Sequence, residues 1–105
     1  MKLANLVPSA VEFDWDEWNL HKNWDKHHVS PIEAEDIFFN EPIIVEHASH
    51  YSGTENRFYA FGRTDKQRLL FIVFTVRRSK IRVISARDMS KKERKKYDEK
   101  IKKNS

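Results

Sequence analysis

Residues 69–87 read LLFIVFTVRRSKIRVISAR. The first eight are almost all apolar or β-branched, a composition typical of a central β-strand. A second strand pattern, IRVISAR at residues 81–87, follows after only four residues. Because so short a connection favours a hairpin, we expect these two strands to be antiparallel neighbours in one sheet.

Three further strand patterns precede this hairpin. Residues 56–62 have the aromatic density of a strand, and residues 42–47 predict an edge strand because Pro42 stands at the start. Residues 11–15 alternate apolar and acidic side chains, which indicates a half-exposed strand. Residues 50–54, which separate the strand patterns at 42–47 and 56–62, are predicted to be a loop.

Helix signals fill the rest of the chain. Asp16 can cap a helix that extends to about Asp25 and turns the tryptophans Trp15, Trp18 and Trp24 toward the core.

A second helix begins at residues 30–33, SPIE, which combine an N-cap serine, a proline at the first helical position and a capping-box glutamate. Ala34, Ile37 and Phe38 are spaced to form its buried stripe, and residues 40–42 would end it.

The last helix opens with a second capping box, Ser90 and Glu93. The elements then follow the order β-α-α-β-β-β-β-α. The sequence therefore predicts an α+β fold, an antiparallel meander sheet with helices packed mainly on one face. A chain of 105 residues suits a single core, so we expect one domain, with a loose leader at residues 1–10 and a basic tail at residues 99–105.

Charge is divided unevenly along the chain. Residues 1–56 hold 3 Lys/Arg against 11 Asp/Glu, and residues 57–105 hold 17 against 5, so the net charges are −8 and +12. Such asymmetry indicates a polyanionic partner, most simply nucleic acid. The absence of cysteine excludes disulfides and thiolate catalysis. With no signal-peptide pattern and no membrane-spanning run, we expect a cytoplasmic protein without membrane contact.

The arginines of the last strand are the first candidate site. Strict alternation places Ile81, Val83 and Ser85 on one face, and Arg82, Ile84 and Ala86 on the other, with Arg87 at the strand end. Rigidly held guanidinium groups can grip a phosphate through two parallel hydrogen bonds. Equally, these arginines could be surface groups that pair with the acidic half of the chain.

Glu55 and Arg57 are the second candidate pair, since two residues of one strand separated by one share a face. They could act as a base and a phosphate anchor, or form an ordinary cross-strand ion pair. His27 and His28 precede the second helix and could transfer a proton near neutral pH, or pack on the tryptophans and cap a helix end. His47 and His50 are not spaced on a helix face, so we predict no metal site.

The last helix carries eight Lys/Arg in residues 91–103, including Arg94 and Lys95. Such a helix is either a solvated face or a surface for a nucleic-acid backbone. Within it, Tyr97 could stack on a base, donate to a phosphate, or pack in the core.

Several of these motifs occur in one order that resembles the BrnT family of ribonuclease toxins. The matching pieces lie in residues 11–98, and IRVISAR followed by E-R-x-x-Y at residues 93–97 is the most specific. Others are FDWD at residues 13–16, Asn23, KHHVS at residues 26–30 (where the family has K-H-G-V-S), E-x-R at residues 55–57, and Gly62. Here His28 replaces a family glycine, and Asn19 stands where relatives commonly have lysine.

The resemblance implies a RelE-like fold and a metal-independent endoribonuclease without a cofactor, which arrests growth and is neutralised by an antitoxin. It implies that the 2′-hydroxyl of RNA attacks the adjacent phosphate. Phosphate stabilisation would then fall to Arg57, Arg82 and Arg87. His27 or Glu55 would transfer protons, Tyr97 would stack or donate a proton, and the RNA backbone would meet Lys26, Arg94 and Lys95.

The implied partners are the RNA substrate and a ribbon-helix-helix antitoxin of the BrnA type, with operator DNA bound only through the complex. The alternative from the residues alone is a non-catalytic module that binds nucleic acid or docks a partner. That alternative explains the basic half without any proton-transfer group.

Overall fold

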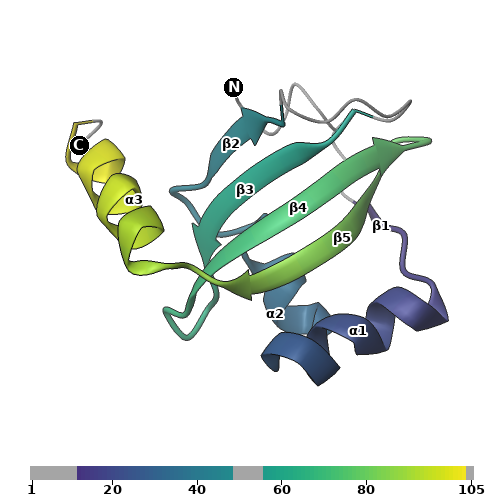
Figure 1. The fold of residues 1–105 in the computed structure, drawn as a ribbon. Helices are drawn as coiled ribbons and strands as arrows, with labels where there is room; N and C mark the ends of the chain where they lie inside the picture. Colours follow the sequence, from purple (N-terminus) through teal and green to yellow (C-terminus); the bar gives the residue numbers. More distant parts are fainter. Residues whose placement is uncertain (1–11, 49–55, 104–105) are drawn as a thin grey trace.

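The computed structural model describes residues 12–48 and 56–103, which form a five-stranded sheet and three helices (Figure 1). The element order is the predicted one. In chain order the elements are β1 (Glu12–Phe13), α1 (Glu17–His27), α2 (Pro31–Asp36), β2 (Ile44–His47), β3 (Phe58–Arg63), β4 (Leu69–Arg77), β5 (Lys80–Asp88) and α3 (Lys91–Lys103). None of these helices is both long and apolar enough to span a membrane.

The sheet has the strand order β1-β5-β4-β3-β2. Strands β2 to β5 form the predicted antiparallel meander, with β4 at the centre and β2 at an edge. The prediction of an entirely antiparallel sheet is wrong at β1, which pairs parallel to β5 through Glu12 and Lys80. The meander leaves its β5 edge open, and the first strand adds to that edge, so the sheet is mixed.

The signals for the start of α2 are confirmed, whereas the predicted end at residues 40–42 is wrong, since the helix ends at Asp36 and Ile37 is its C-cap. Ser30 and Glu33 form both hydrogen bonds of the capping box, each at 3.1 Å, and Pro31 is the first helical residue. The predicted stripe of Ala34, Ile37 and Phe38 is buried, with exposures of 1%, 0% and 4%.

This stripe packs on one face of the sheet, which we call the core face. The residues of the core face are Val45, Phe58, Ala60, Leu70, Ile72, Phe74, Ile81, Val83 and Ala86. The close approach depends on Gly62, where a Cβ atom would lie 3.0 Å from the Cβ of Ile37.

Helix α1 does not pack as predicted. It begins at Asp16, whose carboxylate accepts a hydrogen bond from the backbone N–H of Asn19 at 2.8 Å. Trp18 and Trp24, however, are 73% and 51% exposed, so the prediction that they face the core is wrong. Trp15 is half-buried against the core, and its Nε1 donates to Glu35 at 2.8 Å.

The tryptophans of α1 are exposed because this helix packs against the backbone edge of β5, along the part of that edge that the short β1 does not cover. The Oδ1 of Asn23 accepts from the backbone N–H of Ala86 at 3.1 Å, and Lys22 Nζ donates to the carbonyl of Ile84 at 2.6 Å. A strand edge presents unpaired N–H and C=O groups, so the helix face against it needs polar side chains.

Strand β5 contains a β-bulge. Val73 pairs with Ser85, but the next residue of β4, Phe74, pairs with Val83, which leaves Ile84 as the extra residue. The predicted strict alternation is therefore wrong after Val83. Ser85 joins the side of Arg82, and Ala86 enters the core with an exposure of 0%.

Helix α3 lies at one end of the molecule, away from α1 and α2 (Figure 1). It is fastened by Tyr97, whose hydroxyl donates to the carbonyl of Pro42, and by an ion pair of 2.9 Å between Lys100 and Glu46 of β2. The expectation that the helices pack mainly on one face is thus wrong for α3. The predicted basic tail, as far as it is described, is the last turns of this helix.

Candidate functional site

The face of the sheet opposite α2 is only partly covered, and we call it the open face. The strand register defines its side chains as those that alternate with the core face. They include Ile44 and Glu46 of β2, Tyr59 and Phe61 of β3, Phe71, Val73 and Thr75 of β4, and Arg82, Ser85 and Arg87 of β5.

Arg57 and Arg82 end up in one row across the open face. Arg82 pairs with Thr75, and Arg57 directly precedes Phe58, the partner of Phe74. The hydroxyl of Thr75 donates to the carbonyl of Asn56 at 2.6 Å, which fixes the chain just before β3. The fold therefore brings together two of the three arginines predicted to bind phosphate.

Arg82 is ion-paired with the acidic half of the chain. Its guanidinium donates from Nη2 to Asp16, and Nη1 lies 3.6 Å from Asp14. The backbone N–H of Asn19 and the Arg82 guanidinium hold the pKa of Asp16 below its usual range. These pairs are the alternative that the sequence left open, but they lie at the surface, since both carboxylates are more than 40% exposed.

Lys22 is a third cation in this region, and sequence analysis missed it. Burial beside the carbonyl of Ile84, reinforced by the charges of Lys26 and Arg57, lowers the pKa of Lys22. We refer to Lys22, Arg57 and Arg82 as the cationic cluster. One signal was present in the sequence, because Asn19, Lys22 and Asn23 form a polar face of a helix whose other faces carry tryptophans.

Arg87 lies apart from this cluster. Because Ile84 is bulged out, Arg87 and Arg82 pair with Phe71 and Thr75, which are four residues or about 13 Å apart along β4. Its guanidinium makes two hydrogen bonds to Glu93, of 2.8 and 3.0 Å, and lies 4.4 Å from the ring centre of Phe71. The hydrogen bonds from Arg87 lower the pKa of Glu93.

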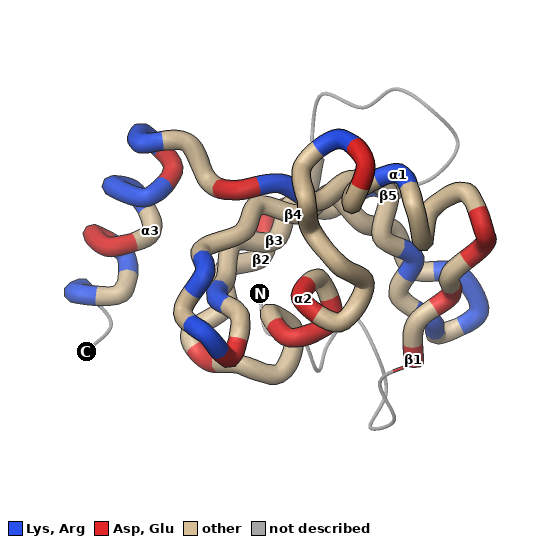
Figure 2. Tube along the Cα trace, turned by 90° about the horizontal axis from the view of Figure 1, so that it is seen from below, with Lys and Arg blue, Asp and Glu red and all other residues tan. Residues whose placement is uncertain are grey.

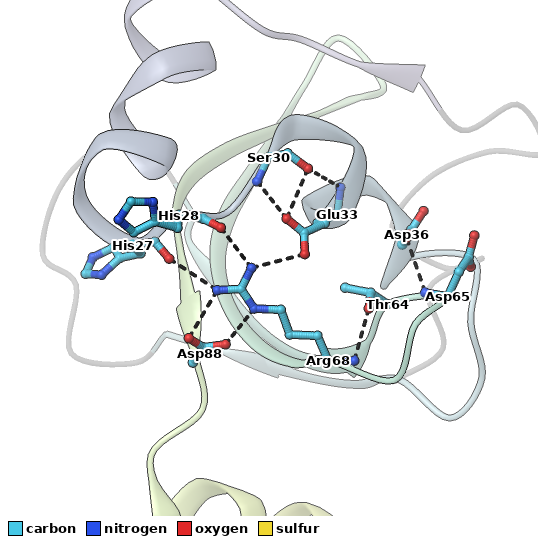
Figure 3. Close-up of polar contacts among 9 residues, drawn as sticks. All are labelled: His27, His28, Ser30, Glu33, Asp36, Thr64, Asp65, Arg68 and Asp88. Atoms are coloured by element: carbon cyan, nitrogen blue, oxygen red, sulfur yellow. Dashed lines mark hydrogen bonds and ion pairs between the residues drawn. The ribbon is translucent and has the colours of Figure 1, made fainter.

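His27 and Lys26 are exposed on the last turn of α1. An α-helix of 11 residues is about 16 Å long, so this turn is far from Asp16 and Arg82 at the other end. The rings of His27 and His28 point outward, whereas their carbonyl groups turn inward to Arg68 (Figure 3).

Arg68 is the centre of a polar cluster that no sequence motif predicts. It donates to both carboxylate oxygens of Asp88, at 2.7 and 3.1 Å, and to Glu33 at 3.0 Å (Figure 3). Two further bonds, of 2.8 and 3.2 Å, go to the carbonyls of His28 and His27. All five N–H groups of the guanidinium are thereby used. Arg68 joins α1, α2 and β5, a structural role.

His28 has the left-handed backbone conformation, with φ 54° and ψ 39°, and ends α1. Glycine favours this conformation because it has no Cβ atom, so a histidine here holds a strained backbone that glycine would not. The imidazole of His28 makes an edge-to-face contact with Trp24, at 5.3 Å between ring centres, and this contact compensates for backbone strain.

The remaining predicted site residues belong to α3 or lie outside the described residues. Arg94 and Lys95 are exposed on α3, where basic residues gather (Figure 2). Tyr97 is 3% exposed and its hydroxyl is bonded to Pro42, so its ring packs in the protein and is not available for stacking on a base. Burial raises the pKa of Tyr97. Glu55 lies outside the described residues, as does His50.

A groove runs between α3 and the open face, with a volume of about 430 Å³. Its floor includes three aromatic rings, of Tyr59, Phe61 and Phe71, which lie 5.1–5.3 Å apart between neighbouring centres. In the sequence, these aromatic residues predict a strand and no site. The alternation of Tyr59 and Phe61 with buried Phe58 and Ala60 was the clue that both faces of β3 are apolar.

Among the residues that the structure describes, no three His, Asp or Glu side chains converge as metal ligands would. A family model described as "ribonuclease toxin, BrnT, of type II toxin-antitoxin system" matches residues 15–93. The chain belongs to the BrnT family. Comparison with curated proteins gave no match.

Membership of the BrnT family makes the chain a ribonuclease toxin of the type II toxin–antitoxin class, with RNA as the implied substrate and an antitoxin as the implied partner. The matched residues include the cationic cluster and the whole sheet except β1. They end at Glu93, near the start of α3.

Proposed function

We propose that this BrnT-family chain is a metal-independent endoribonuclease with its scissile phosphate bound at the cationic cluster. The observation that carries the proposal is the placement of three cations: Arg57, just before β3, and Arg82 of β5 share a row of the open face, and Lys22 of α1 lies at the adjoining edge of β5, close enough to Arg57 and Asp16 to feel their charges. Fixed positive charges next to a reacting phosphate stabilise the negative charge that develops in the transition state.

RNA brings its own nucleophile to this reaction. A base removes the proton of the 2′-hydroxyl, the 2′-oxygen attacks the adjacent phosphorus, and the bond to the 5′-oxygen breaks as that oxygen takes up a proton. The products are a 2′,3′-cyclic phosphate and a free 5′-hydroxyl. The protein must therefore orient the strand, neutralise the phosphorane and exchange two protons.

The cluster supports distinct roles for its members. Arg57 and Arg82 are the proposed phosphate ligands, because a guanidinium offers paired donors to phosphate oxygens. Lys22 is the proposed proton donor to the leaving oxygen, since a lysine with a lowered pKa gives up its proton more readily near neutral pH.

Glu55 is the proposed base, on the ground that it precedes Arg57 by two residues in the sequence. His27, the other residue predicted for proton transfer, lies at the far end of α1. We therefore place it with Lys26 among residues that contact RNA outside the scissile bond. Arg87, Arg94 and Lys95 join them as proposed contacts to flanking phosphates.

The ion pairs of Arg82 with Asp14 and Asp16 do not preclude this role. Exposed pairs of this kind contribute only about 0.2–1 kcal/mol each. A phosphate can therefore share or replace the carboxylates, and until then the pairs hold the guanidinium in place.

The proposal includes the cellular consequence and the partner. Cleavage of cytoplasmic RNA would arrest growth, and a ribbon-helix-helix antitoxin of the BrnA type, which alone would contact operator DNA, would neutralise the toxin. The lysines and arginines along α3 support an acidic antitoxin segment as the inhibitor (Figure 2). A RelE-like fold remains a prediction alongside these.

The test is incubation of the purified protein with end-labelled RNA in excess chelator. Fragments that end in 2′,3′-cyclic phosphate and begin with a 5′-hydroxyl support the proposal. The rival, a non-catalytic module, predicts intact RNA and a mobility shift that weakens with salt. A 2′-deoxy substitution at one cleaved position should abolish cutting there alone, and continued cleavage at that position would refute attack by the 2′-oxygen.

A further inference from the structure

The groove between α3 and the open face has no role in the chemistry above. Its floor is aromatic, since Tyr59 and Phe61 of β3 flank Phe71 of β4, with ring centres 5.3 and 5.1 Å from that of Phe71. All three rings are partly exposed, although the opposite face of the same strands is buried. Half-exposed aromatic rings on one face of a sheet offer stacking surfaces.

The wall of the groove is cationic. Lys92, Lys96 and Lys100 lie on one face of α3 and line it. Lys100 is paired with Glu46, while Lys92 and Lys96 have no acidic partner within hydrogen-bond distance in the described part of the chain. The other acidic residue of the lining, Glu93, is engaged by Arg87. Two uncompensated positive charges therefore face an aromatic floor.

This combination fits single-stranded nucleic acid. Unpaired bases stack on aromatic rings at roughly 1–3 kcal/mol per base, and lysines beside them contact the backbone phosphates. In a duplex the base faces are already stacked on one another, so the floor would be unused. A purely apolar peptide would leave the lysines without partners.

We infer that this groove binds unpaired nucleobases of the RNA substrate, so that the chain acts on single-stranded rather than duplex RNA. The inference rests on the proposed function for the identity of the substrate. Arg57 and Arg82 of the cationic cluster share the open face with the groove, and Arg87, whose guanidinium lies over Phe71, is about 13 Å along the sheet from Arg82. Bases held in the groove would belong to nucleotides flanking the scissile phosphate.

The test measures binding without cleavage. A 2′-O-methyl oligonucleotide cannot attack its own phosphates, so fluorescence anisotropy reports affinity alone, for the single strand and for the same strand in a duplex. We expect the single strand to bind at least about tenfold more tightly. Phe71→Leu and Tyr59→Leu should each weaken single-strand binding by roughly 5- to 150-fold.

Two further variants test whether the aromatic rings and the lysines of the groove itself account for the binding. Phe39→Leu makes the same chemical change at an aromatic residue that is 62% exposed outside the groove, and it should leave affinity unchanged. Lys96→Gln changes an exposed helix residue and leaves the core intact. It should reduce the slope of log affinity against log salt concentration by about 1, the value for one lost phosphate contact.

Equal affinity for single strand and duplex would overturn the inference, as would wild-type affinity in the two aromatic variants. If those variants weaken the antitoxin complex and leave RNA binding intact, the groove is a protein-docking site and the inference is wrong. Failure of the proposed function is a separate outcome, in which the groove variants lose binding but the wild-type protein leaves unmodified RNA intact.

Discussion

Arg82→Ala removes a guanidinium that shares a row with Arg57 and pairs with Asp14 and Asp16. The two ion pairs are at the surface and contribute about 0.2–1 kcal/mol each, so the free energy of unfolding should fall by no more than about 2 kcal/mol. Since small domains have about 5–15 kcal/mol, the variant should remain folded at 25 °C.

The expected effect on catalysis is much larger. Removal of one hydrogen-bond donor that stabilises transition-state charge costs about 10²- to 10³-fold in rate. The assay is single-turnover cleavage of a fluorescent RNA in chelator, with chemical denaturation of the same preparation to measure stability. Loss of cleavage with a nearly unchanged unfolding midpoint is the predicted result.

Asp16→Asn is the matched control. Asparagine caps a helix about as well as aspartate, so the variant keeps the start of α1 and loses only the charge that faces Arg82. We expect its cleavage rate to equal or exceed that of the wild type, because Arg82 then meets the phosphate without a competitor. If Arg82→Ala cleaves RNA at the wild-type rate, or if both variants lose activity only in proportion to stability, Arg82 is a structural ion-pair residue and the placement of the phosphate is wrong.

Three predictions concern the scaffold. Arg68→Met should lower the free energy of unfolding by about 2–4 kcal/mol in urea denaturation, because charged hydrogen bonds to two carboxylates and two carbonyls are lost. The same change should also make the free energy of unfolding depend less on pH under acidic conditions. Hydrogen bonds from Arg68 lower the pKa of Asp88. In Glu33, burial raises the pKa, but the hydrogen bonds from Ser30 and Arg68 lower it by more. The stabilisation is therefore present above about pH 4 and is lost as the pH falls through the lowered values, so an equally acid-sensitive variant would contradict the assignment. His28→Gly should raise the unfolding free energy by about 0.5–1 kcal/mol through relief of the left-handed backbone, and a loss would mean that the Trp24 contact outweighs the strain. Gly62→Ala should cost about 1–3 kcal/mol by overpacking against the turn after α2, whereas an unchanged melting temperature would show that this turn can move away.

Elements with a strong local signal were predictable. The capping box of Ser30 and Glu33 set the start of α2, and the apolar run of β4 marked the centre of the sheet, because both signals depend on residues close in sequence. The burial of Ala34, Ile37 and Phe38 followed from their spacing alone.

The wrong predictions for α1 and β5 have one physical origin. In both, contact with a neighbouring element decided which way the side chains face. Trp18 and Trp24 suggested a core-facing helix, but α1 meets the edge of β5, where backbone groups require Lys22 and Asn23. The bulge at Ile84 was invisible in IRVISAR, because it is defined only by pairing with β4.

The sequence by itself determined the element order, the α2 core and an acidic half followed by a basic half, since these depend on composition and short-range spacing. Only the tertiary structure decided which charges meet. Asp16 and Arg82 are 66 residues apart in the chain and form an ion pair, whereas Arg87, though near Arg82 in sequence, points to a different part of the open face. Proximity of this kind depends on strand register and helix docking, and no local pattern in a single sequence encodes it.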